Sequence, residues 1–150
     1  MTEKDSVAAS TRRLVVERAQ GCCEYCLSQA RYCPDPFPVE HIYPASRGGS
    51  SDPDNLALSC QGCNNAKFVS TTAVDPVTDT AVPLFHPRAH RWEDHFAWSH
   101  ELTHVIGLTA PGRATVLRLR LNREGVVNLR EVLAAAGKHP PEIPRPATDP

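Results

Sequence analysis

Residues 53–67 read PDNLALSCQGCNNAK, an apolar run that leads directly into a pair of cysteines, Cys60 and Cys63. A second pair with the same internal spacing, Cys23 and Cys26 in CEYC, lies upstream of residues 27–59. Zn²⁺ favours four thiolates in a tetrahedron, and a CxxC turn directs two sulfurs at one ion. The two pairs therefore predict one closed, structural zinc site. Two disulfides are the alternative, which the lack of a secretory signal disfavours.

The segment between the two cysteine pairs predicts a hairpin followed by a helix. It begins with a zinc knuckle and continues with VEHI, residues 39–42, then a loop rich in Gly, Ser, Asp and Pro, then NLALSC, residues 55–60. Two short apolar runs separated by turn-forming residues are typical of antiparallel strands joined by a wide loop. We expect the helix to begin near Cys60.

The flanking segments predict further helices and strands of an α+β fold. Residues 9–19, ASTRRLVVERA, have a helical pattern that ends at a glycine. Residues 72–108 are rich in Thr, Val, Phe and Trp, which favours strands or irregular packed segments, and residues 113–137 favour two helices. The final segment, residues 139–150, is rich in proline and is predicted to be a disordered tail.

Composition limits the classes of function that the chain can have. The chain has 150 residues and a net charge of -1, and 41% of its residues are hydrophobic. This length and hydrophobic content suffice for one domain with a modest core. No apolar stretch is long enough to span a membrane, and the polar N-terminus lacks a secretory signal, so a cytoplasmic location is expected. The chain has 16 basic and 17 acidic residues, so its overall charge does not attract nucleic acid. Any phosphate binding must therefore come from local clusters of charge.

Glu40 and His41 stand side by side in VEHIYPASRGG, residues 39–49, between the two cysteine pairs. Together with the CxxC pairs and PDNLALSCQGCNNAK, this stretch resembles the HNH endonuclease family. The resemblance implies a ββα-metal (His-Me finger, treble-clef-like) core with flanking helices and a few extra strands. It implies a single HNH domain over residues 1–138, with its core at 22–70. It further implies a phosphodiester hydrolase acting on DNA, with RNA as the open alternative.

The resemblance also implies a role for each polar residue of this core. His41 would be the general base, since an imidazole with a pKa near about 6.5 is largely neutral at pH 7 and accepts a proton from water. Glu40 and Asn64 would bind a catalytic Mg²⁺ or Mn²⁺, which prefers oxygen ligands. Glu40 stands where the family more often has aspartate. Asn55 would hold the loop after His41 through hydrogen bonds to its backbone.

Two basic residues are expected to contact the nucleic acid. Lys67 follows Asn64 by three residues, hence on the same helical face, and would meet a phosphate; a solvated surface lysine is the alternative. Arg47 lies in the loop after His41 and is assigned to the same contact. Gly48 and Gly49 would let this loop bend and let a nucleic-acid backbone come close.

Residues 100–104 spell HELTH, which satisfies the HExxH signature of zinc metallopeptidases. That signature works on a helix, whereas β-branched residues and the breaker LTAPG follow here, so a metallopeptidase is disfavoured. The remaining histidines, His86, His90 and His95, are expected to be structural or surface residues. A zinc module that binds nucleic acid or a protein without cutting is the rival to the endonuclease at the level of class.

Overall fold

The computed structural model describes residues 7–143, and its first half contains the predicted hairpin and helix. Strand β1 (Val39–His41) pairs antiparallel with β2 (Leu56–Leu58), with Glu40 opposite Ala57 and His41 opposite Leu56. Helix α2 (Gln61–Lys67) follows directly, and Cys60 caps it by accepting a hydrogen bond from the Cys63 amide. The hairpin and the helix after Cys60 were thus predicted correctly.

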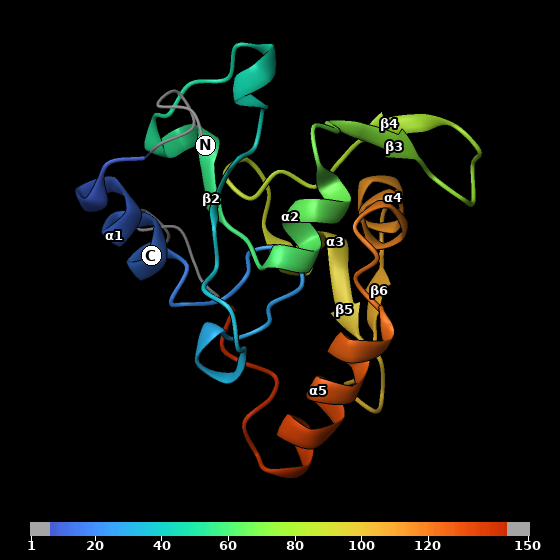
Figure 1. Cartoon of the computed structure of the whole chain (residues 1–150). Helices are drawn as coiled ribbons and strands as arrows, with labels where there is room; N and C mark the ends of the chain where they lie inside the picture. The colour runs from blue at the N-terminus through green and yellow to red at the C-terminus, as the bar shows by residue number, and fades with distance from the viewer. Residues whose placement is uncertain (1–6, 144–150) are drawn as a thin grey trace.

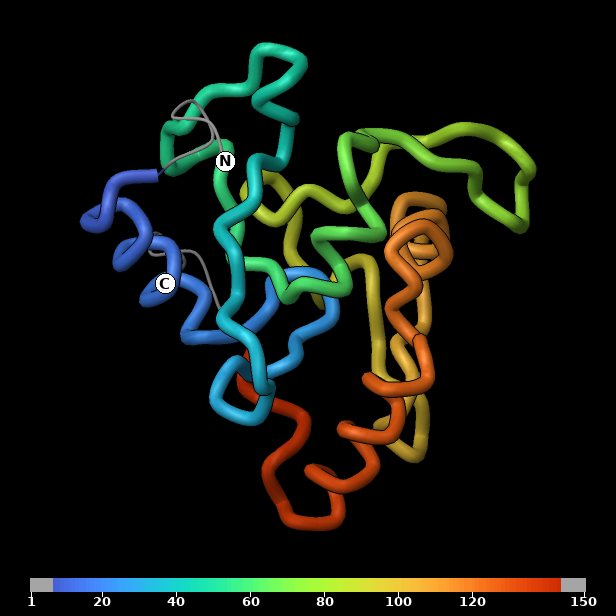
Figure 2. The backbone as a smooth tube through the Cα atoms, viewed as in Figure 1, coloured from blue at the N-terminus to red at the C-terminus, as the bar shows by residue number. Residues whose placement is uncertain are grey.

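Helix α1 (Ala9–Arg18) covers the outer side of the hairpin, where Arg18 donates a hydrogen bond to the Leu56 carbonyl. In Figure 1, α2 lies at the centre of the molecule, between β2 on one side and α4 on the other. The trace in Figure 2 shows that the wide loop between β1 and β2 projects away from this centre. Residues 45–54 of this loop are exposed or partly exposed.

The second half of the chain adds two more antiparallel strand pairs and three helices. Strand β3 (Thr72–Val74) pairs with β4 (Ala81–Pro83), and β5 (Phe96–Trp98) pairs with β6 (Val105–Gly107). The helices are α3 (Trp92–His95), α4 (Ala110–Arg118) and α5 (Glu124–Ala135). Mixed helices and small antiparallel pairs confirm the α+β class, and the two helices expected over residues 113–137 are α4, which begins slightly earlier at Ala110, and α5.

One buried cluster joins both halves of the chain. It combines α1, the first cysteine turn, the hairpin, β5 and the segment after α4, and its members include Tyr25, Leu27, Leu56, Leu58, Phe85, Trp92, Phe96, Leu119 and Leu121. Burying an aliphatic or aromatic side chain of this size contributes roughly 1.5–3 kcal/mol. The cysteine turns are part of this core and not a separate appendage.

The first residues of the predicted tail contact the rest of the protein. His139 is buried, with Nε2 2.8 Å from the Leu102 carbonyl oxygen and its ring edge-on to Trp98, and Ile143 packs against the core. The prediction of disorder is therefore wrong for residues 139–143, because an aromatic and an apolar residue among the prolines find partners. The rest of that prediction lies outside the described residues. Among those described, no helix is long and apolar enough to cross a membrane.

Candidate metal centre and hydrolase site

The four predicted zinc ligands meet in one cluster. The sulfur atoms of Cys23, Cys26, Cys60 and Cys63 all lie within 4.8 Å of one another, and all four residues are buried. Cys26 Sγ and Cys60 Sγ are 3.6 Å apart. Four sulfurs bound to one Zn²⁺ at ~2.3 Å would lie about 3.8 Å apart in a tetrahedron, so the donor set fits zinc. None of the cysteines in the described residues forms a disulfide, which favours the zinc site over the disulfide alternative.

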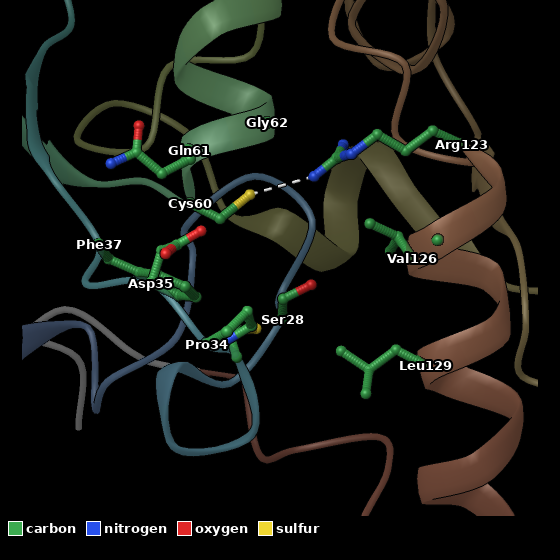
Figure 3. Close-up of a pocket in the computed structure, with 12 residues that line it drawn as sticks. Ser28, Pro34, Asp35, Phe37, Cys60, Gln61, Gly62, Arg123, Val126 and Leu129 are labelled. Carbon is green, nitrogen blue, oxygen red and sulfur yellow. Dashed lines mark hydrogen bonds between the residues drawn. The ribbon is translucent and has the colours of Figure 1, made fainter.

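Arg123, the residue before α5, reaches the same cluster from the other half of the chain. Its Nη2 lies 3.2 Å from Cys60 Sγ (Figure 3). Its Nη1 lies 3.7 Å from Cys63 Sγ. Four thiolates and one Zn²⁺ carry a net charge of -2, so a guanidinium beside the sulfurs is electrostatically favourable. Gly62 makes room for it, because a Cβ there would lie 2.5 Å from Arg123 Nη2.

A pocket of about 180 Å³ borders this cluster. Figure 3 shows Cys60 and Arg123 at one end and the apolar side chains Val126 and Leu129 of α5 along one wall. The polar residues assigned from sequence to the hydrolase site do not line it. The residues assigned to the hydrolase site therefore lie at the hairpin and α2, apart from this pocket.

Glu40 lies on the buried face of β1 and is only 4% exposed. One of its carboxylate oxygens accepts a hydrogen bond from the Tyr25 hydroxyl, and the other lies 3.0 Å from Lys67 Nζ. Burial raises the pKa of Glu40 above its ordinary value, although the Lys67 charge and the Tyr25 hydrogen bond oppose this. Both oxygens are thus engaged inside the protein, which does not fit the expected role of metal ligand.

The position of Lys67 fits neither of the two expectations from the sequence, a phosphate contact or a solvated surface lysine. It is 1% exposed, and besides the ion pair with Glu40 it donates a hydrogen bond of 2.9 Å to the Ile42 carbonyl. A buried ammonium cannot meet a phosphate in this arrangement, nor is it a solvated surface lysine. The sequence-based placement of Lys67 on the surface is therefore wrong. Periodicity gives the face of α2 but not what covers that face, and here the hairpin covers it.

His41 points away from Glu40, as adjacent residues of a strand must. It is half-buried, and its Nε2 lies 2.9 Å from Ser51 Oγ in the wide loop. The two neighbouring residues therefore have different surroundings. The carboxylate is sealed inside between α2 and the first cysteine turn, while the imidazole lies at the edge of the loop.

Asn55 closes the base of the wide loop. Its Oδ1 accepts a hydrogen bond of 2.9 Å from the Tyr43 amide, and its Nδ2 donates to the carbonyls of Tyr43 and Ser50 at 3.0 and 2.8 Å. These are the side-chain to backbone bonds expected from sequence. Gly49 is also required here, because a Cβ would lie 1.9 Å from the Tyr43 carbonyl oxygen. The backbone around His41 is held on both sides.

Asn64 and Arg47 are both accessible, unlike Glu40 and Lys67. Asn64 is half-buried on α2, and its side-chain amide makes no hydrogen bond to another residue of the described part of the chain. Arg47 is exposed, its guanidinium lies 5.2 Å from the centre of the Tyr43 ring, and its Nη1 lies 3.4 Å from the Val69 carbonyl oxygen. Arg47 thus joins the wide loop to the chain just after α2.

Sequence reasoning missed four residues that support the site. Tyr25 and Glu24 lie inside CEYC: Tyr25 binds Glu40, and the Glu24 carboxylate accepts from the Leu58 amide and pairs with Arg88. Arg123 is the fourth. Residues between two cysteines carry no periodicity that reveals which way they point, and Arg88 and Arg123 are distant in sequence. No sequence signal that we used would have found them.

HELTH does not form a metallopeptidase site. Its residues make the turn between β5 and β6, where the Ser99 amide donates to the His104 carbonyl. His100 and His104 are therefore not one helical turn apart, as the signature requires. Among the described residues, the four cysteines are the only group of three or more His, Cys, Asp or Glu side chains placed to share a metal ion.

The remaining histidines are structural, as expected. His86 Nδ1 accepts from the backbone amides of Arg88 and Ala89, and His90 Nδ1 accepts from the His86 amide. His95 Nδ1 lies 2.6 Å from Thr109 Oγ1. The His90 and His95 rings pack against Phe85, and the His86 ring packs against His90, so these residues order the segment between β4 and α3.

Comparison with known proteins agrees with this geometry. The family model described as HNH endonuclease matches residues 23–68, which comprise the first cysteine turn, the hairpin and α2. Residues 23–68 of the chain are therefore similar to the HNH endonuclease family. No curated protein and no solved structure matches the chain.

Proposed function

We propose that this protein is an endonuclease that hydrolyses phosphodiester bonds in DNA through an HNH, ββα-metal type of centre with one divalent cation. The observation that supports this best is the match of residues 23–68 to the HNH endonuclease model, with His41 placed at the accessible edge of the matched hairpin. The zinc cluster holds the hairpin and α2 in place and does no chemistry, because four thiolates leave no open position on the ion.

In this proposal His41 takes a proton from the attacking water. Only a neutral imidazole accepts a proton, and His41 lies half-buried at the edge of the wide loop. Ser51 limits the rotation of the ring through its contact with Nε2, and Asn55 fixes the backbone that carries His41. Neither residue reacts itself. Both keep the base in one orientation.

The catalytic cation would be held mainly by Asn64. Its amide oxygen is accessible, and Mg²⁺ or Mn²⁺ needs only one or two protein oxygens because it keeps several waters. Such a cation stabilises the negative charge on the leaving oxygen and on the phosphate. Glu40 does not fit beside it while it is paired with Lys67 and Tyr25. In this arrangement Glu40 connects β1, α2 and the first cysteine turn.

The non-catalytic zinc module stays the alternative, and one observation favours it. The carboxylate that would ligate the cation in the HNH scheme is neutralised internally by Lys67, as it would be in a core with a purely structural role. A module of this kind would bind nucleic acid or a protein through its surface and would have no need of His41 or Asn64. The metallopeptidase reading has no support from the geometry of HELTH.

We expect Asn64→Ala to weaken binding of the divalent cation, so that nicking requires a higher concentration of it. Loss of a ligand should raise the Mg²⁺ or Mn²⁺ concentration for half-maximal nicking of supercoiled plasmid by about 10- to 100-fold, and excess metal should restore part of the rate. Asn65→Ala is the matched control, since Asn65 is exposed on the same helix. If both variants respond to metal alike, Asn64 is not the ligand.

A further inference from the structure

Phe68, the first residue after α2, is an exposed aromatic side chain in a strained backbone conformation. It is 72% exposed, the largest exposed fraction among the large hydrophobic residues of the described chain. Its φ of 51° and ψ of -118° lie in a region that favours glycine. A bulky residue is unfavourable there, and strain of this kind is found mainly at functional sites.

A tight turn over residues 67–70 presents the Phe68 ring to solvent. The Lys67 carbonyl accepts a hydrogen bond of 2.9 Å from the Ser70 amide, which places Phe68 at the second position of the turn. The buried Lys67 side chain anchors the start of this turn through Glu40 and Ile42. The turn is thus fixed from inside.

Two arginines flank this turn. Arg47 Nη1 lies 3.4 Å from the Val69 carbonyl oxygen, and Arg118 Nε and Nη2 lie 3.1 and 2.8 Å from Ser70 Oγ. Both arginines are exposed, and each guanidinium has five N–H donors, so donors remain for a ligand. We call Arg47, Phe68, Ser70 and Arg118, with the half-exposed Tyr43 beneath Arg47, the Phe68 surface.

The Phe68 surface lies next to the proposed cation site. The Phe68 amide donates to the Asn64 carbonyl, so the two residues are one helical turn apart, about 6 Å along the axis. Successive nucleotides of one DNA strand are ~3.4 Å apart. A base beside the Phe68 ring would therefore lie within about two steps of a phosphate at Asn64.

We infer that the Phe68 surface binds the nucleic acid and that the Phe68 ring stacks on a base displaced from the helix beside the cut phosphodiester. Arg47 and Arg118 would bind the flanking phosphates, for which a guanidinium fork is well suited. An aromatic platform with adjacent cations is the arrangement that binds unstacked bases. The inference rests on the proposed function, because it places this surface beside that site.

The test uses full-length, zinc-loaded protein carrying His41→Ala, so that binding is read without cleavage. The probe is a fluorescein-labelled DNA duplex with one 2-aminopurine, whose emission rises when the base leaves the stack. We expect Phe68→Gly to weaken binding by about 5- to 150-fold, the range for loss of one aromatic–base stack, and to abolish the rise in emission. Phe68→Trp, which keeps an aromatic ring, should retain both.

Two controls separate the ring from the fold. Glycine accepts the φ of residue 68 without strain, so Phe68→Gly should unfold at the same or a higher temperature than the parent. Leu117→Ala removes another exposed apolar side chain, 60% exposed on α4, and should leave DNA binding unchanged.

The inference is overturned if Phe68→Gly binds the duplex as tightly as the parent with the same rise in emission. It is also overturned if Phe68→Gly converts a dimer into a monomer in sedimentation while DNA binding persists, since the ring would then cover a second copy of the chain. Neither readout needs cleavage. Wild-type protein that never nicks DNA would refute the proposed function. If the protein does nick DNA but Phe68→Gly changes neither binding nor emission, only the role of Phe68 is refuted.

Discussion

His41→Ala should lower the rate of plasmid nicking by about 10²- to 10⁴-fold, the usual loss when a general base is removed. The zinc content and the fold should be unchanged, because His41 is half-buried at the edge of β1 and lies apart from the cysteine cluster. DNA binding should also persist, since the basic contacts come from other residues. Extra Mg²⁺ should not restore the rate, because no metal ligand has been lost.

The measurement is the initial rate of conversion of supercoiled to nicked plasmid. Added imidazole should partly rescue His41→Ala, because it can accept the proton in place of the missing side chain. His100→Ala is the matched control: His100 is exposed in the turn between β5 and β6 and should have no effect on the rate. Equal rates for His41→Ala and wild type would refute the proposed base.

Removal of zinc should unfold the protein. Binding of a structural Zn²⁺ contributes an apparent ~10–16 kcal/mol, which is as large as the whole free energy of unfolding of a typical domain, about 5–15 kcal/mol. Here the four cysteines are buried within the core, and without the ion nothing would link their sulfur atoms to one another. Loss of structure at the cysteine turns should therefore also unfold the hairpin and α2.

The purified, reduced protein should contain about one zinc per chain by elemental analysis, and a strong chelator should abolish its cooperative thermal transition in circular dichroism. Cys60→Ser should do the same without a chelator. Cys33→Ser is the control, because Cys33 is a half-exposed thiol outside the cluster. Folded, reduced protein that holds no zinc would contradict the assignment.

The zinc cluster, the hairpin and α2 could be predicted because their signals are local. CxxC spacing forces two sulfurs together, and alternating polarity in VEHI places Glu40 and His41 on opposite faces. Alternation does not predict which face is buried or which residues pack against it. The Lys67–Glu40 pair arises only because α2 packs across β1, and the partner Tyr25 comes from the first cysteine turn.

Contacts between the two halves of the chain were beyond sequence reasoning for a related reason. Arg123 meets Cys60 and Cys63 across 60 residues or more, and no pattern in a single sequence records that pairing. His139 was assigned to a disordered tail on composition alone, although it is buried against Trp98. HELTH was correctly discounted, because the β-branched residues that follow it form β6.

The central claim is that residues 23–68 form a hydrolytic centre and not a zinc-bound binding module. The most direct test is to incubate zinc-loaded wild-type protein with supercoiled plasmid and Mg²⁺ or Mn²⁺, beside His41→Ala purified in the same way. The account predicts nicked plasmid from the wild type, only in the presence of the divalent cation, and at most traces from the variant. Retarded but uncut plasmid with both proteins, or equal nicking by both, would contradict it.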